Sequence, residues 1–103
     1  MNTARKFRLH DGQSGAALVV KIIKNPTENR IDKIEENGNV VIWLQSNLSL
    51  AECNKSIIDL LSIATGIHKD QFEIVVDDKS DRKIISIIGE SPEFVINKLI
   101  RYL

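Results

Sequence analysis

Cysteine is almost absent from this 103-residue chain, which also has two prolines, five glycines and only 5% aromatic residues. With Cys53 alone, an internal disulfide cannot form and a metal cluster built on several cysteines is excluded. No stretch approaches the ~20 apolar residues that a membrane span needs, and the opening MNTARKFRLH lacks the apolar run of a signal peptide. These absences predict a cytoplasmic protein that does not enter a membrane.

A net charge is also lacking, because 14 basic residues balance 14 acidic ones. No overall field therefore draws the chain to nucleic acid or to an acidic membrane. The charges are nevertheless uneven: residues 1–24 hold five basic side chains and one acidic, whereas residues 51–81 hold seven acidic and three basic. Residues 1–15 read as a flexible, solvated N-terminal tail, and residues 16–103 as a single domain.

Helix and strand signals divide the domain clearly. Ser49 and Glu52 form a capping box that predicts a helix start, and Gly66 is suited to the left-handed residue that ends it. Ser91 followed by Pro92 predicts the start of a second helix. Runs rich in β-branched residues predict strands, and these runs are 16–24, a weak one at 30–34, then 40–45, 72–76 and 83–88.

The order of these elements, β-(β)-β-α-β-β-α, predicts an α+β fold. Its economical packing is a two-layer domain with both helices on one face of a mixed four- or five-stranded sheet. The helix between strands 40–45 and 72–76 suits a parallel pairing of those two strands. Strands 72–76 and 82–88, joined by a short charged turn, predict a hairpin.

Three segments carry a resemblance to a known family. NRI (29–31) ends the first loop, SNLSLAECN (46–54) opens the first helix and keeps Asn54, and DDKSDRK (77–83) keeps Ser80 and Lys83. In this pattern residues 15–103 resemble the YggU-like family of uncharacterised domains, as a divergent member with degenerate motifs. Asp81 replaces a family arginine, for example. The resemblance implies the α+β fold, and it implies no activity.

The DDKSDRK turn can be interpreted in two ways. Free backbone N–H groups, a serine hydroxyl and two basic side chains could hold a phosphate. The same seven residues contain three aspartates, however, so an anion would meet a neutral loop, and a solvated charged hairpin is the alternative. A calcium loop is not supported, because the glycine and the distal glutamate of an EF-hand are missing. The candidate anion- or RNA-binding residues are Lys21, Lys24, Arg30, Asn54, Ser80, Arg82 and Lys83.

Catalytic signals are scarce. Cys53 falls on the apolar stripe of the first helix, where it reads as a small core residue. The chain has no glycine-rich phosphate loop and no serine, histidine and aspartate in a recognisable order. We therefore expect a non-enzymatic protein that needs neither metal nor cofactor.

Alternation in the strands indicates where a partner could bind. The resemblance implies that Val40, Ile42 and Leu44 face the helices, so that the alternate residues of each strand face the open side of the sheet. That side would then carry an apolar patch typical of an interaction surface for a protein partner or a homodimer. The predicted patch comprises Val19, Ile23, Val41, Trp43, Ile84 and Ile88. Two alternatives remain: the N-terminal segment or residues 25–39 cover the patch, or the register is shifted by one residue.

Overall fold

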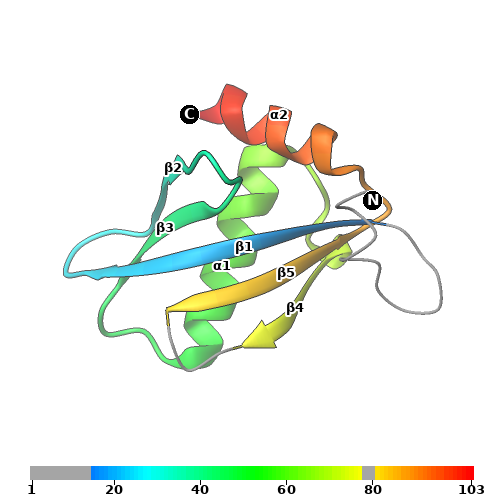
Figure 1. Ribbon diagram of the computed structural model, residues 1–103. Coiled ribbons are helices and arrows are strands. Elements are labelled where there is room, and N and C mark those ends of the chain that lie inside the picture. The colour runs from blue at the N-terminus through cyan, green and yellow to red at the C-terminus, as the bar shows by residue number, and fades with distance from the viewer. Residues whose placement is uncertain (1–14, 78–80) are drawn as a thin grey trace.

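A computed structural model of the chain describes residues 15–77 and 81–103, and it has the predicted α+β architecture (Figure 1). The weak segment at 30–34 is a full strand, so the mixed sheet has five strands. Within the described residues, no helix combines the length and apolar character that crossing a membrane requires. Along the chain the elements are β1 (Gly15–Asn25), β2 (Arg30–Ile34), β3 (Val40–Gln45), α1 (Leu50–Thr65), the 3₁₀ turn η2 (Lys69–Gln71), β4 (Phe72–Asp77), β5 (Arg82–Ile88) and α2 (Pro92–Tyr102).

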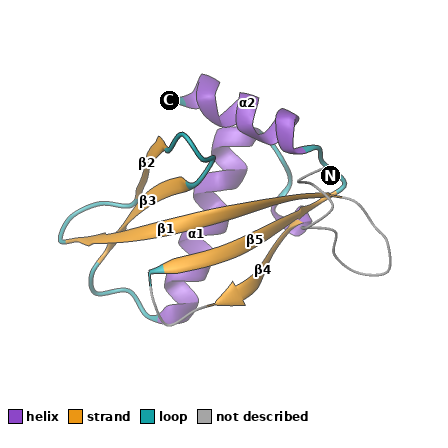
Figure 2. Cartoon of the chain, viewed as in Figure 1, coloured by secondary structure: helices purple, strands orange, loops and turns teal. Residues whose placement is uncertain are grey.

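Strand β1 lies at the centre of the sheet, whose order is β2-β3-β1-β5-β4 (Figure 2). It pairs in parallel with β3 and antiparallel with β5, while β2 and β4 form hairpins with β3 and β5. The predicted hairpin of β4 and β5 is confirmed. The predicted parallel pairing of β3 with β4 is wrong, because β1 and β5 lie between them and the parallel partner of β3 is β1.

Both helices begin where their capping residues predict. The Ser49 hydroxyl accepts a hydrogen bond from the Glu52 backbone N–H at 3.2 Å, and the Ser49 N–H donates to the Glu52 carboxylate at 2.9 Å. Gly66 ends α1 with a φ of 75°, a left-handed conformation that costs glycine little. In α2 the Ser91 hydroxyl accepts from the Phe94 N–H at 3.1 Å. These local contacts fix the helix ends without help from the sheet.

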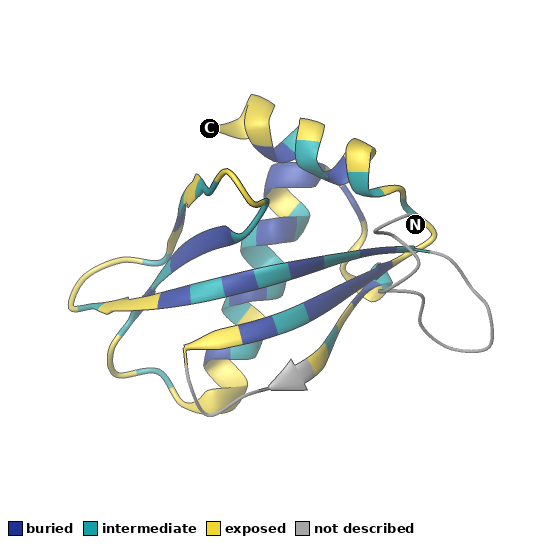
Figure 3. Cartoon of the chain, viewed as in Figure 1, coloured by how far each residue is buried: buried dark blue, intermediate teal, exposed yellow. Residues whose placement is uncertain are grey.

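The core lies between the sheet and the helices. The sheet contributes alternate residues of β1 and β3 and the side chains of Ile85 and Ile87 of β5. These are buried against the apolar stripe of α1 and against Val95 and Leu99 of α2. Helix α1 passes behind the sheet in Figure 1, and the dark bands of buried residues alternate with paler ones along β1 and β5 in Figure 3. Each strand therefore has one face under the helices and one face turned away from them.

Both edges of the sheet are irregular. The pairing of β2 with β3 shifts between Ile31 and Lys33, and the pairing of β4 with β5 shifts between Ile74 and Val76. Such bulges twist an edge strand and interrupt its row of hydrogen-bonding groups. They make strand-to-strand association with another chain unfavourable.

Candidate functional site

The face of the sheet turned away from the helices, here called the open face, is the principal candidate site. Pairing in register places its residues in rows that cross the strands. One row contains Arg30, Trp43 and Ile23, and the next contains Lys33, Val41, Lys21 and Arg82. The third contains Val19 and Ile84, and the fourth contains Ala17, Ser86 and Glu73. Ile88 lies opposite Gly15 at the far end.

Exposure on the open face is uneven. Ile23 is 47% exposed and Ile88 is 37% exposed, and they lie towards opposite ends of the sheet. Val19 and Ile84, between them, are partly exposed. Val41 is only 1% exposed, so the expectation that it forms part of an accessible patch is wrong. The accessible apolar side chains therefore lie on β1 and β5, where the Lys21–Arg82 pair separates Ile23 from Val19 and Ile84, and β3 contributes little.

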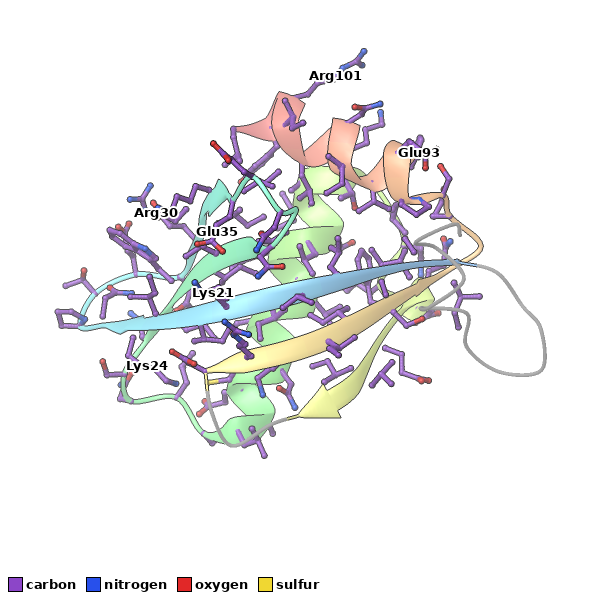
Figure 4. The ribbon with its side chains drawn as sticks, in the orientation of Figure 1. Lys21, Lys24, Arg30, Glu35, Glu93 and Arg101 are labelled. Atoms are coloured by element: carbon purple, nitrogen blue, oxygen red, sulfur yellow. The ribbon has the colours of Figure 1, made fainter. Side chains whose placement is uncertain are left out.

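Residues 30–35 cover the β3 side of this face. The Arg30 guanidinium lies 4.2 Å from the centre of the Trp43 ring, a cation–π contact across the β2–β3 pair. The Lys21 ammonium pairs with the Glu35 carboxylate at 3.2 Å, over the strands next to Val41. Figure 4 shows these labelled side chains on β1, β2 and the turn that follows β2. The alternative in which residues 25–39 cover the patch therefore holds for Val41 and in part for Trp43.

Trp43 has one unusual polar atom. Its indole nitrogen Nε1 is buried and has no hydrogen-bond acceptor among the residues that the structure describes. A buried donor without an acceptor costs about 1–3 kcal/mol. Part of the stability gained by packing the Trp43 ring is therefore offset by its unpaired N–H group.

A row of cations crosses the open face. Lys21 lies directly opposite Arg82 on the neighbouring strand, and Lys33 lies in the same row beyond Val41. The Ile22 N–H donates to the Asp81 carbonyl at 2.6 Å, which makes Lys21 and Arg82 a non-hydrogen-bonded pair, the type whose side chains lie closer. Like charges in that arrangement are destabilising. Glu35 compensates Lys21, and in the described part of the chain no ion pair compensates Lys33 or Arg82.

The candidate anion-binding residues do not form a single site. Lys21, Arg30 and Arg82 lie on the open face, and Arg30 also pairs with Glu28 at 3.1 Å and Asp32 at 3.7 Å. Lys83 lies opposite Val20 on the helix-facing side and is only 5% exposed. Asn54 belongs to α1, and Ser80 lies outside the described residues. The sheet therefore separates the basic residues that the sequence grouped together.

Lys24 also lies on the helix-facing side. Its ammonium is 3.3 Å from the Cys53 sulfur, in the first turns of α1. The cysteine is buried and belongs to the core cluster, as expected for a small core residue. The contact connects the end of β1 to the start of α1.

The sequence did not point to one member of the cation row, Lys33, or to Glu35, which pairs with Lys21. The positions of both relative to Lys21 depend on the register shift in β2. Among the described residues, no group of three or more histidine, cysteine, aspartate and glutamate side chains is placed to hold a metal ion. The chemistry that the open face offers is therefore apolar contact and ion pairing.

Comparison with known proteins adds no further assignment, because no protein-family model and no curated protein matches the chain. The resemblance of residues 15–103 to the YggU-like family remains a prediction from the motif residues.

Proposed function

We propose that this protein is a non-enzymatic interaction module whose open face binds the open face of a second copy. The observation that supports this proposal is the difference between the two faces of the sheet. The helices cover one face, while Val19, Ile23, Ile84 and Ile88 leave apolar surface accessible on the other. An uncovered face usually alternates to polar residues, and large apolar side chains exposed on such a face can mark an interaction surface.

The dimensions of the face favour a partner that is itself a flat surface. Five strands spaced ~4.8 Å apart and about seven residues long at ~3.3 Å each give roughly 24 × 23 Å, or about 550 Å² per copy. Two copies in contact over the whole face would bury at most about 1,100 Å², close to the lower limit for a specific interface. The face is therefore large enough for a dimer of moderate affinity.

The character of the surface favours a second copy over a polyanion. Near the cation row, the basic residues Lys21 and Arg30 are already paired with Glu35, Glu28 and Asp32. A surface carrying both signs of charge, on a chain with no net charge, does not attract polyanions over a distance. The same mixture of charges allows two identical surfaces to complement each other. Because the bulges disfavour pairing through the edge strands, two copies would associate through the open face.

The test is the solution mass over a wide range of protein concentration, by sedimentation equilibrium. Ile84→Lys places a charge at the centre of the open face, and Ile63→Lys makes the same change at an α1 position that is 68% exposed on the helical layer. We expect the wild type and Ile63→Lys to dimerise equally, and Ile84→Lys to remain a folded monomer by circular dichroism. A monomeric wild type at all concentrations would refute the proposal.

The second candidate is an RNA- or anion-binding module, favoured by one observation. The ends of β1 and β3 and the start of β5 lie at the same end of the sheet, which brings the loops after β1 and β3 to the end where β5 begins. Binding of a labelled single-stranded oligonucleotide would fall steeply with added salt if this candidate were correct. Salt-insensitive dimerisation without oligonucleotide binding would favour the apolar face. The cytoplasmic location predicted from the sequence is compatible with either.

A further inference from the structure

Positive charge is concentrated at one place on the open face. Lys21 and Arg82 lie directly opposite each other as a non-hydrogen-bonded pair of β1 and β5, so their side chains lie close together. Glu35 pairs with Lys21 at 3.2 Å. Arg82 is exposed, and among the residues that the structure describes no ion pair compensates it. An uncompensated cation therefore lies beside the apolar row of Val19 and Ile84.

The row on the other side of Val19 and Ile84 offers this cation no partner in a second copy. It contains Ala17, Ser86 and Glu73. Ser86 is only 2% exposed, alanine has no polar side-chain atom, and Glu73 already has an interaction within the chain. A dimer whose two-fold axis runs across the strands would lay the cations of one copy over this row, and they would remain uncompensated.

An axis that runs along the strands has a different result. Placed midway between β1 and β5, it lays Val19 of each copy over Ile84 of the other, so the apolar rows meet. The same operation lays Lys21 of each copy over Arg82 of the other. Four cations then converge within one strand spacing of ~4.8 Å and one gap of ~10 Å between stacked sheets.

The charge at this place determines which ion could compensate it. Four cations and the two Glu35 carboxylates leave two positive charges in excess. A divalent oxyanion such as HPO₄²⁻ has the opposite charge, and its oxygens can accept paired hydrogen bonds from a guanidinium group. The Lys21 ammonium has three donors, so its bond to Glu35 leaves others for the ion. Without an ion, the facing cations oppose association.

We infer that free inorganic phosphate binds between two copies, in contact with Arg82 and Lys21 of each, and promotes the open-face dimer. This inference rests on the proposed function, because it adds a ligand and a means of regulation to the same interface. The ion is bound by contacts from both sides when the faces meet, so it does not need the long-range attraction that a neutral chain lacks. The phosphate concentration then changes the fraction of dimer by mass action.

The test compares sodium phosphate with sodium chloride of equal ionic strength, at a slightly alkaline pH where phosphate is divalent. We expect phosphate to lower the dimer Kd at least about tenfold in sedimentation equilibrium. ADP carries phosphoryl groups on a nucleoside that is too large for a closed gap of ~10 Å, so we expect ADP to have no effect. Stronger promotion by ADP than by phosphate would overturn the enclosed site.

Arg82→Gln tests the position of the ion. In chloride this variant relieves the repulsion between cations, so its dimer Kd should equal or fall below that of wild type. Phosphate should then no longer lower the Kd. Arg101→Gln is the matched control, because Arg101 is exposed on α2 and extends away from the sheet in Figure 4. It should respond to phosphate as the wild type does.

The outcomes separate the ion from the interface. If Ile84→Lys abolishes a dimer that phosphate leaves unchanged, the face is correct and the inferred ion is wrong. If phosphate promotes the Arg82→Gln dimer as strongly as the wild-type dimer, the ion binds elsewhere and the inference is also wrong. If wild type stays monomeric in both salts, the proposed function itself fails. Unfolding in urea, measured for every variant, shows that each remains folded.

Discussion

The adjacent residues Ile84 and Ile85 of β5 lie on opposite faces of the sheet and differ in burial. Ile85 is fully buried in the core with α1 and α2, whereas Ile84 is only partly covered, on the open face. The residues share a strand, a side chain and a backbone conformation, so their difference comes only from which face they occupy. The covered face stabilises the fold, and the open face is left for contact with another molecule.

The largest expected change in stability comes from truncating one isoleucine on each face of β5. Ile85→Ala removes a buried side chain and should lower the free energy of unfolding by about 2–5 kcal/mol. Ile84→Ala removes the same atoms from a partly exposed position and should cost less than half as much. Urea unfolding at a protein concentration where the chain is monomeric measures both. Equal losses would mean that the open face is as important to folding as the core.

Local signals in the sequence were sufficient for the elements. Ser49, Glu52 and Gly66 predicted both ends of α1, because caps depend on residues within one turn of the chain. The two-residue period of β3 separated Ile42 from Trp43, and the family resemblance assigned Ile42 to the face under the helices, where the structure places it. The β1–β3 pairing was not predicted, because no local sequence signal shows which strands will pair when they are distant in the chain.

The candidate site was less predictable, for two reasons. Val41 lies between Lys21 and Lys33 of the neighbouring strands, and Lys21 is held there by Glu35. The position of Lys33 opposite Val41 follows from a register shift that the sequence does not reveal. The grouping of Arg82 with Lys83 failed for a simpler reason. Adjacent residues of a strand point to opposite faces, so the sequence already contained the information that separates them.

A smaller effect concerns the cover over Trp43, the only tryptophan in the chain. Arg30→Ala removes the guanidinium from the ring, and it should cost about 0.5–1 kcal/mol while making Trp43 easier to quench with acrylamide. Arg30→Lys keeps the charge but loses the flat stacking group, and we expect intermediate quenching. Unchanged quenching in Arg30→Ala would show that Arg30 does not shield the open face.

The smallest effect lies on the helical side and depends on pH. Hydrogen bonds from Lys69 and Lys55, each at 2.9 Å, lower the pKa of Asp59 from its ordinary 3.8. A lowered folded-state pKa contributes stability above pH 3.8, and this contribution is lost as the pH falls through the lowered value. Asp59→Asn should therefore be less stable than wild type at neutral pH by under about 1 kcal/mol.

The pH dependence of that difference is the measurement. Urea unfolding of wild type and Asp59→Asn should give curves that converge as the pH falls below 3.8. Oligomerisation should not change, because Asp59 lies on α1 and not on the open face. A difference that stays constant across this acid range would contradict the assigned ion pairs.

The central position of β1 has a consequence for the synthesis of the protein. Ala16 pairs with Ile87, a separation of 71 residues (87 minus 16), so β1 completes its pairing only after the residues up to β5 have left the ribosome. The hairpins of β2 with β3 and of β4 with β5 can form earlier from local contacts. Until β5 emerges, β1 has an unpaired edge during translation. That interval is when the nascent chain is most exposed to aggregation.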